Sequence, residues 1–520
     1  MRQTNTALTS EQKETLIRDY HPDYKKSAYR TLRTGPNRGA QTVRELADLL
    51  EADSPIPDYG KIPDPDFQTD VLVVGGGGAG AAAALTASEE GAEVLLVTKL
   101  RLGDSNTVMA EGGMQVSLSP SDSPIRHYLD TLRGGNMKND HALVRILVSD
   151  GPSAAQWLMS LGVRFDREEN GAPSLRAGGG SSQPRLLRCK DYTGLEMMRV
   201  LKDEVLNRGI QQLEFSPIVE LATDASGRCT GAVLKNVDTG RLIFIQAKGV
   251  ILATGGIGRL HIQGFPTSNH YGATADGLPV AYRAGARLVL QDTFQYHPTG
   301  AVFPEPIAGM LVTEAIRVAG AHLVNAHGQR FIHEMETRDA VAAAVIRECE
   351  HGRGVQTPLG RRGVWLDMPM VDLMHGEGTL ATRFPNMVRQ YTRYHIDIGH
   401  EPVLVYPTLH YQNGGVEMNA DGASNICNLF VAGEVSGGLH GNNRLMGNSL
   451  LDMIVFGRRA GRAAARQARP LPWGTLTFQH LFAFRKARQE AGLSSAHTSP
   501  MLFPDYVRRE QMEQIGISEG

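Results

Sequence analysis

The chain has 520 residues, with 53 Lys and Arg against 55 Asp and Glu, so its net charge is −2. This balance argues against nucleic acid as the main partner, because phosphate binding needs a net basic surface. Hydrophobic residues make up 41 % of the chain, enough for the cores of several domains, and the 58 glycines follow no three-residue period, which excludes a collagen.

The four cysteines are far apart in the sequence and form no CxxC pair or Cys/His cluster (Cys189, Cys229, Cys349 and Cys427). The sequence therefore predicts no metal site within this chain, and a reduced, cytoplasmic compartment is the simplest fit. The N-terminus lacks the apolar run of a signal peptide, and no stretch approaches the roughly 20 apolar residues that span a bilayer. We expect no direct membrane insertion, so any membrane contact would go through a partner.

Residues 1–66 are predicted to form an N-terminal arm and linker. Thr42 and Glu45 have the spacing of a capping box, and apolar residues then recur at i, i+3, i+4 and i+7. This pattern predicts one short amphipathic helix over residues 43–50. Prolines before residue 66 indicate an extended linker. We expect the arm to lie on the main body of the protein or on a partner.

A βαβ unit follows the linker. A strand at residues 70–74 precedes a glycine-rich turn, an alanine-rich helix and a second strand at residues 93–98. The motif G-x-G-x-x-G stands at Gly75, Gly77 and Gly80. The first glycine allows a tight turn, the second lets the backbone approach a pyrophosphate, and the third allows the helix to pack closely on the strand. Because amides at a helix N-terminus bind phosphate, the unit predicts a dinucleotide site.

The acid that binds ribose, expected roughly 20 residues after the glycine motif, is missing. Thr98 and Lys99 stand there instead, and a lysine would suit the 2′-phosphate of NADP, although the remaining motifs favour FAD. Two further apolar strands, at residues 249–256 and 428–434, also end in small residues. Such strand ends can pack against a long, flat cofactor.

Polar residues gather among small residues in five short segments, which lie at residues 296–300, 311–317, 338–339, 406–411 and 438–444. A single histidine is more often structural than catalytic, and Arg338-Asp339 alone would most simply open the helix predicted over residues 340–350. Histidines and arginines flanked by glycine in five segments are harder to explain by packing, and together they indicate a catalytic site.

At this level of detail the chain resembles the flavoprotein subunits of succinate dehydrogenase and fumarate reductase, and their relative L-aspartate oxidase. The resemblance runs from about residue 70 to residue 465. Besides the Gly75 motif it rests on Thr98-Lys99, Ser105-Asn106-Thr107, Ala110-Glu111-Gly112-Gly113, Ala253-Thr254-Gly255-Gly256, His297-Pro298-Thr299-Gly300, Thr313-Glu314, Arg338-Asp339, His410-Tyr411 and the run from Gly433 to Leu450. A lysine at position 99 is expected in this family, which removes the NADP alternative.

The resemblance implies an α/β fold, with a Rossmann-like FAD-binding domain in two segments, an inserted α+β capping domain and a short helical C-terminal tail. The expected parts are the arm and linker (1–66), the first FAD-binding segment (67–298), the capping domain (299–403), the second FAD-binding segment (404–467) and the tail (468–520). We also expect helices at about residues 455–467 and 479–490. Catalysis would sit where the capping domain meets the FAD-binding domain.

The resemblance also implies roles for individual residues. The expected FAD-binding residues are Gly75, Gly77, Gly80, Lys99, Ser105, Asn106, Gly112, Gly113, Ala253, Gly255, Asp276, Glu434, Arg444, Ser449 and Leu450. The expected catalytic residues are His297, Thr313, Glu314, Arg338, His410 and Arg444. Most of the latter would clamp a dicarboxylate, while Arg338 resembles the family's arginine proton shuttle. Because arginine has a high pKa, it would need a relay with a carboxylate, for which Glu314 is the candidate.

Two departures from the family pattern bear on function. Membrane-bound members link FAD covalently to a histidine, and Asn106 stands at that position here. Asparagine lacks a nucleophilic ring nitrogen, so we expect non-covalent FAD, whose lower potential favours fumarate reduction. L-aspartate oxidases carry a glutamate that can hold the substrate ammonium, and Leu129 replaces it here. This leucine favours succinate or fumarate over aspartate.

The sequence thus predicts FAD-dependent interconversion of fumarate and succinate by hydride transfer at flavin N5. The alternatives are an L-aspartate oxidase, a FAD-bearing electron-relay subunit without dicarboxylate turnover, and an enzyme for a larger unsaturated acid. Because the scattered cysteines cannot build a redox chain, we expect an iron–sulfur partner subunit, docked in part through residues 1–66.

Overall fold

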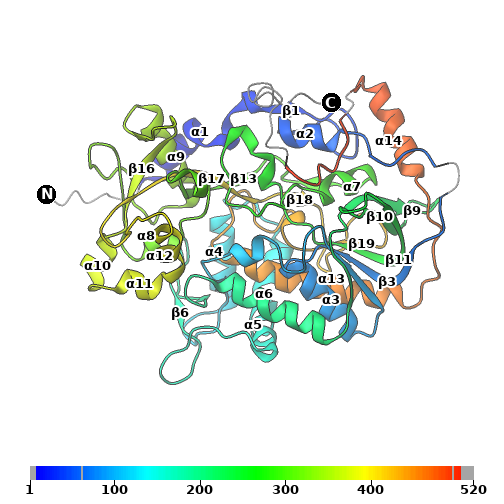
Figure 1. Ribbon diagram of the computed structural model, residues 1–520, viewed down its shortest axis with the longest axis horizontal. Helices are drawn as coiled ribbons and strands as arrows, with labels where there is room; N and C mark the ends of the chain where they lie inside the picture. Colours follow the sequence, from blue (N-terminus) through cyan, green and yellow to red (C-terminus); the bar gives the residue numbers. More distant parts are fainter. Residues whose placement is uncertain (1–7, 60–61, 495–496, 505–520) are drawn as a thin grey trace.

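A seven-stranded sheet forms the centre of the structure, a computed structural model that describes residues 8–59, 62–494 and 497–504. The strand order is β8 (Gln211–Leu213), β4 (Val94–Val97), β3 (Phe67–Val74), β11 (Leu242–Leu252), β10 (Cys229–Lys235) and β9 (Ile218–Thr223), and β19 (Leu429–Val431) also pairs with β11. β8, β4, β3, β11 and β19 run parallel, whereas β10 is antiparallel to both its neighbours. The predicted mixed α/β fold is confirmed (Figure 1).

The three strands predicted to end in small residues are neighbours in this sheet. Leu252 of β11 pairs with Val74 of β3 on one side and with Val431 of β19 on the other. The carboxyl ends of β3, β11 and β19 therefore lie at one edge, and the turns that follow them face a common space. In open α/β sheets this edge is where ligands bind.

Two helices, α3 (Gly78–Glu89) and α13 (Asn448–Ala468), pack against each other and against this sheet. A Cβ on Gly461 of α13 would lie 2.3 Å from the carbonyl oxygen of Ala83, so only glycine permits this close approach. The helix predicted over residues 455–467 is confirmed as the C-terminal part of the longer α13. Helices α5 (His141–Leu161) and α6 (Thr193–Asn207) pack on α13 and α3, respectively.

A second, antiparallel sheet forms another part of the structure, where the sequence places the expected capping domain. Its order is β13 (Phe294–Ala301), β17 (Val403–Gln412), β16 (Arg362–Asp367) and β14 (His322–Val324), with β15 (Val355–Gln356) on β16. Its helices are α8 (Glu314–Val318), α9 (Arg338–Glu350), α10 (Met370–His375), α11 (Thr379–Arg383) and α12 (Pro385–Thr392). This part has a hydrophobic core of its own. The expected boundaries at residues 299 and 403 fall on β13 and β17, so these strands run out of the capping domain toward the FAD-binding part.

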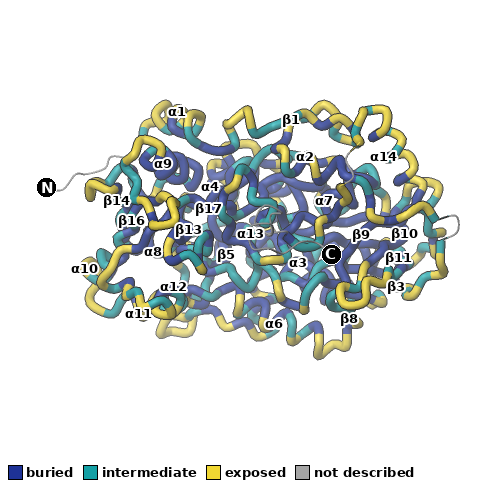
Figure 2. Tube along the Cα trace, turned by 45° about the horizontal axis from the view of Figure 1, so that its top comes forward, coloured by how far each residue is buried: buried dark blue, intermediate teal, exposed yellow. Residues whose placement is uncertain are grey.

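Shorter elements complete the structure. β5 (Met114–Gln115), β7 (Leu186–Leu187) and β6 (Leu175–Arg176) form a small sheet, and β12 (Leu288–Val289) pairs with β18 (Gly415–Val416). The remaining helices of the FAD-binding part are α4 (Pro124–Gly134) and α7 (Gly277–Arg283), and α14 (Gln479–Glu490) confirms the helix predicted in the tail. Buried residues concentrate in the strands, whereas α10 and α11 lie exposed at the rim (Figure 2). No helix in the described ranges is both long and apolar enough to cross a bilayer.

The N-terminal arm lies on the protein body and reaches both of its parts (Figure 1). α1 (Ser10–Tyr20), which the sequence did not predict, packs against α9, and its Leu16 joins the core of the capping domain. After the hairpin of β1 (Tyr29–Thr31) and β2 (Gln41–Val43), α2 (Arg44–Leu50) packs on α7 and buries Leu46 in the core of the large sheet. The apolar stripe of α2 is thereby covered by this chain and is not available to a partner.

The capping box predicted at the start of α2 is wrong. The helix begins after Val43, which makes no side-chain cap. Thr42 Oγ1 instead donates to the carbonyl oxygen of Gln291 (2.6 Å), and a carboxylate oxygen of Glu45 accepts from the backbone N–H of Gln263 (2.7 Å). Both polar side chains therefore attach the arm to the rest of the protein. They bond to backbone groups of the body, and such groups need hydrogen-bond partners when they are buried.

Candidate functional site

The turn between β3 and α3 has the close packing that its glycines predict. Gly75 has a φ of +125°, and a Cβ there would lie 2.1 Å from the carbonyl oxygen of Ala253. A Cβ on Gly80 would lie 1.8 Å from the carbonyl oxygen of Gly75, so no side chain fits between helix and turn. Gly77 precedes the first residue of α3 and lines the cavity at the edge of the sheet. The helix N-terminus thus faces a space suited to a pyrophosphate.

All but one of the residues that the sequence assigned to cofactor or substrate line this one cavity. The exception is Gly80, which lies beneath the turn in α3. The lining residues are Gly75, Gly77, Lys99, Ser105, Asn106, Gly112, Gly113, Ala253, Gly255, Asp276, His297, Thr313, Glu314, Arg338, His410, Glu434, Arg444, Ser449 and Leu450. Tertiary structure therefore brings together segments that are almost 400 residues apart.

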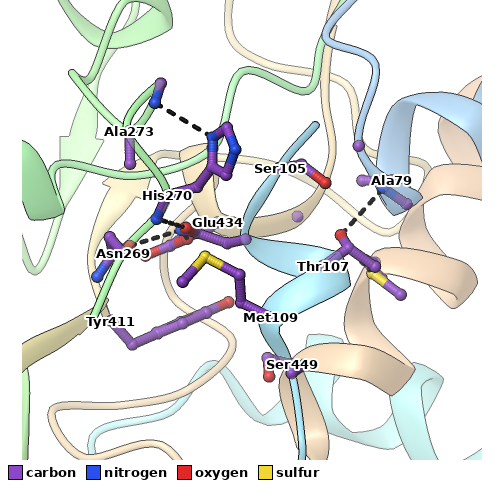
Figure 3. Close-up of a pocket in the computed structure, with 18 of the residues that line it drawn as sticks. Ala79, Ser105, Thr107, Met109, Asn269, His270, Ala273, Tyr411, Glu434 and Ser449 are labelled. Atoms are coloured by element: carbon purple, nitrogen blue, oxygen red, sulfur yellow. Dashed lines mark hydrogen bonds between the residues drawn. The ribbon is translucent and has the colours of Figure 1, made fainter. Parts of the chain in front are cut away.

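Both polar atoms of the Asn106 side-chain amide make hydrogen bonds. Its Nδ2 donates to Asn269 Oδ1 (2.5 Å) and Glu434 Oε2 (3.2 Å), and its Oδ1 accepts from the backbone N–H of His270 (2.6 Å). Figure 3 shows Asn269, His270 and Glu434 gathered on one side of the cavity, with Ser105 nearer the helix that carries Ala79. Burial raises the pKa of Glu434, against the opposing effect of the hydrogen bonds that it accepts.

Lys99 and Asp276, both expected at the cofactor, contact each other. Lys99 Nζ lies 2.6 Å from Asp276 Oδ2 and donates to Thr274 Oγ1 (2.5 Å). Both side chains of the ion pair are largely buried, with exposed fractions of 11 % and 6 %. The lysine that replaces the usual ribose-binding acid therefore holds a carboxylate, from a distant segment, in the cavity wall.

Strands β13 and β17 bring two histidines together. The rings of His297 and His410 have centroids 5.2 Å apart, and His410 Nδ1 lies 2.8 Å from Ser268 Oγ. Burial, followed by the positive charge of Arg338, holds the pKa of each histidine well below its usual value. Both imidazoles are therefore neutral at physiological pH, and each can donate one N–H to a bound carboxylate.

A chain of arginine, glutamate and arginine leads away from the cavity. Arg338 Nε donates to Glu314 Oε2 (2.6 Å), and Arg317 Nη2 lies 3.4 Å from the same oxygen. All three side chains are buried. Burial by itself raises the pKa of Glu314, but the charges of Arg338 and Arg317 hold it below its usual value. The sequence placed Arg317 in the polar segment at residues 311–317 without a role, although its i+3 spacing from Glu314 on a helix indicated a contact between the two.

Gln295 joins the two arginines of the cavity, and sequence reasoning missed it. Its Oε1 accepts from Arg338 Nη1 (2.8 Å) and from Arg444 Nη2 (3.0 Å). The guanidinium carbon of Arg444 also lies 4.4 Å from the ring centroid of Tyr411. Burial, and then the charge of Arg338, lower the pKa of Arg444 to about 10. The buried Nε of Arg444 has no hydrogen-bond partner among the described residues, which suits a bound anion.

The residue used to argue against aspartate as substrate does not reach the cavity. Leu129, on α4, is 43 % exposed and is not among the lining residues. Its neighbour Asp130 points inward and accepts from the buried Arg185 (Nη1–Oδ2, 2.6 Å). Leu129 therefore gives no argument against aspartate as the substrate.

The comparisons with known proteins agree with this geometry. The family profile described as "FAD binding domain" matches residues 70–450. The chain belongs to this family. It is 40 % identical over 412 residues to one of the subunits of the fumarate reductase (CoM/CoB) of Methanothermobacter marburgensis, covering 77 % of this chain and 73 % of the relative. It is 37 % identical to L-aspartate oxidase of Streptomyces coelicolor, covering 78 % and 71 %.

Solved structures of the family extend the match to the fold. A structure of E. coli quinol fumarate reductase matches this chain with a TM-score of 0.73 at 33 % identity, covering 82 % of this chain and 74 % of the other. The resemblance read from the sequence is confirmed: the protein is an FAD-dependent oxidoreductase of the succinate dehydrogenase/fumarate reductase flavoprotein type. The relatives include fumarate reductases and aspartate oxidases, so the choice of substrate has to be argued from the site.

The cavity fits FAD. The glycine turn leaves room for a pyrophosphate, Asn106 and Glu434 provide polar groups on the wall, and the free Nε of Arg444 provides a buried donor. Gly75, Gly77, Ser449 and Leu450 would hold the cofactor together with the other lining residues named above.

Proposed function

We propose that this protein interconverts fumarate and succinate, with fumarate reduction favoured. The observation that carries the proposal is the buried group of donors at one end of the cavity: Arg338 and Arg444, with the neutral His297 and His410 beside them. A substrate with two carboxylates would be held there by charge-assisted hydrogen bonds, which are roughly twice as strong as neutral ones. Thr313, buried at the start of α8, adds a hydroxyl donor.

The same residues account for the chemistry. Reduced FAD, when bound, would supply the hydride that one alkene carbon of fumarate accepts. Arg444 and the histidines would stabilise the negative charge that develops on a carboxylate as the alkene accepts this hydride. Arg338 would donate a proton to the neighbouring carbon and regain it through Glu314 and Arg317. Two electrons and two protons are then transferred in total, as the conversion of fumarate to succinate requires.

We propose that FAD is held without a covalent bond. Asn106 stands at the position of the linking histidine, and its amide has no nucleophilic nitrogen and is committed to three hydrogen bonds. Acid precipitation of the purified protein should leave yellow flavin in the supernatant. Flavin that stays in the protein pellet would contradict this attachment.

We also propose that electrons come from an iron–sulfur partner subunit. The four cysteines are free thiols, of which three are buried and only Cys427 is exposed. No group of three or more His, Cys, Asp or Glu within residues 8–59, 62–494 and 497–504 is placed to hold a metal. Relatives are named as subunits, among them the flavoprotein subunit of the succinate dehydrogenase of Coxiella burnetii. Co-purification from the native source tests this, and a solitary protein fully active with a physiological donor would rule it out.

Turnover assays separate the candidate activities. The purified holoprotein should oxidise reduced viologen dye when fumarate is added, and should produce no hydrogen peroxide with L-aspartate and oxygen. Peroxide formation from L-aspartate at the higher rate would favour an aspartate oxidase instead. Flavin reduction without turnover of either acid would favour the electron-relay subunit, which would not need buried Arg338 and His297.

A further inference from the structure

Residues 498–504, which we call the C-terminal clasp, reach the wall of the FAD site from the far end of the chain. The carbonyl oxygen of Leu502 accepts from Lys99 Nζ (2.7 Å) and from Thr274 Oγ1 (3.2 Å). Lys99 Nζ also contacts Thr274 Oγ1 and Asp276 Oδ2. Because an ammonium group has three N–H donors, these three acceptors use all of them. One of the three acceptors that hold Lys99 Nζ therefore comes from the clasp.

Aromatic contacts join the clasp to the adjacent loop. Phe503 stacks on Tyr271 with ring centroids 5.9 Å apart, and Lys99 Nζ lies 5.8 Å from the centroid of Phe503. His270, which precedes Tyr271, lines the cavity and donates its backbone N–H to Asn106. The clasp thus supports the loop that shapes this side of the cavity.

The clasp is itself fixed to the FAD-binding part. Ser499 is buried, and its Oγ and carbonyl oxygen accept from Arg283 (2.6 and 3.0 Å). Arg283 is held in turn by the buried Glu220 (2.8 Å). The backbone N–H of Ser499 donates to the carbonyl oxygen of Asp53 (2.8 Å), and the side chain of Leu502 packs against a small apolar core. The clasp is therefore a rigid support.

We propose that the C-terminal clasp slows the release of FAD by holding Lys99, Asp276 and the loop at residues 269–274 in the bound arrangement. The match to the family ends at residue 450, and no residue of the clasp lines the cavity, so the clasp acts through the residues that do. A site that is already ordered pays less to bind its ligand and releases it more slowly. The inference rests on the proposed non-covalent attachment, since only unlinked FAD can be released.

The first test compares two variants of the clasp. Phe503→Ala removes the ring that contacts Tyr271 and Lys99, whereas Met501→Ala truncates an exposed side chain of the same segment. FAD dissociation, followed by flavin fluorescence, should be roughly 3- to 30-fold faster in Phe503→Ala, the range expected for a lost cation–π contact. Met501→Ala should match the wild type. A wild-type release rate in Phe503→Ala, with or without a lower melting temperature of the apoprotein, would overturn the proposal.

The second test asks whether the clasp acts through Lys99. A chain that stops after residue 504 should release FAD at the wild-type rate, and a chain that stops after residue 496 should release it about tenfold faster. In the Lys99→Met background the shorter chain should add less than it does in the wild type, because the Lys99 contacts are already lost while the contact between Phe503 and Tyr271 remains to be removed. Fully additive effects would overturn the action through Lys99. Flavin that cannot be released from any variant would overturn the proposal itself, and it would identify the non-covalent attachment as the failed premise.

Discussion

The two ends of the cavity are built in different ways. The proposed cofactor end consists largely of backbone and small residues, such as Gly75 and Gly77, which come from consecutive elements of one βαβ unit. The proposed substrate end consists of large, buried, charged side chains, among them Arg338 on α9 and Arg444 in the segment after β19. The shape of the wall should therefore decide binding at the first end, and the charge of the side chains should decide it at the second. Substitutions should separate flavin binding from turnover.

The largest expected effect is at the substrate end. Arg338→Lys keeps the positive charge but loses the planar group that contacts Glu314 and Gln295 at once. Loss of a positioned proton donor should lower kcat for fumarate by at least about 10²-fold, while FAD content stays at the wild-type level. Steady-state kinetics and the flavin absorbance of the purified variant check this. Near-normal turnover would contradict the role of Arg338.

A substitution at the cofactor end should weaken FAD binding and leave turnover unchanged. Gly80→Ala places a Cβ where the carbonyl oxygen of Gly75 lies, and overpacking of this kind costs about 1–3 kcal/mol. FAD affinity should fall by roughly tenfold or more, and turnover of the molecules that still hold FAD should be unchanged. Gly249→Ala is the matched control, because its Cβ would meet Ala464 at an ordinary 3.6 Å. Equal FAD affinities of the two variants would show that the turn is not the binding element.

A smaller loss of activity is expected when the residue that joins Arg338 and Arg444 is changed. Gln295→Leu removes the oxygen that accepts from both Arg338 and Arg444, leaving the two cations without a common partner. A hydrogen bond to a charged group contributes about 1.5–3 kcal/mol, so kcat/KM should fall by roughly tenfold or more with FAD content unchanged. Tyr296→Phe, which removes a buried hydroxyl with no partner among the described residues, should leave kcat/KM near the wild-type value. Similar rates for Gln295→Leu and wild type would remove Gln295 from the site.

The smallest effect concerns stability and not activity. Burial lowers the pKa of His127 from 6.5 to about 4, so the unfolded chain binds a proton there at a higher pH than the folded protein. Stability should therefore fall as pH drops below about 6.5, and His127 should account for about 1 kcal/mol of the loss between pH 7 and pH 5.5. Urea unfolding of His127→Gln should show a correspondingly flatter pH dependence. His400→Gln is the control, because Asp397 raises the pKa of this exposed histidine, so its loss should not flatten the curve.

Local sequence determined the cofactor end. The conformation of a glycine turn depends on its own backbone and on the strand and helix next to it, so the Gly75 motif predicted the turn. The small residues after β11 and β19 marked the ends of two further strands, and the sheet makes these strands neighbours. The order of short motifs along the chain also identified the family and the candidate residues of the cavity. These are properties that neighbours in the sequence encode.

Tertiary structure decided the rest, because long-range contacts leave no local pattern. Leu129 was used to argue against aspartate as the substrate, yet the packing of α4 leaves its side chain exposed and outside the cavity. Thr42 and Glu45 have the spacing of a cap, but partners some 220 residues or more away compete for their side chains. Gln295 becomes a bridge only when α9 brings Arg338 to it, and Lys99 meets the carbonyl oxygen of Leu502 only in the folded chain. A hydrogen bond between distant segments is set by how elements pack, and no spacing in the sequence records it.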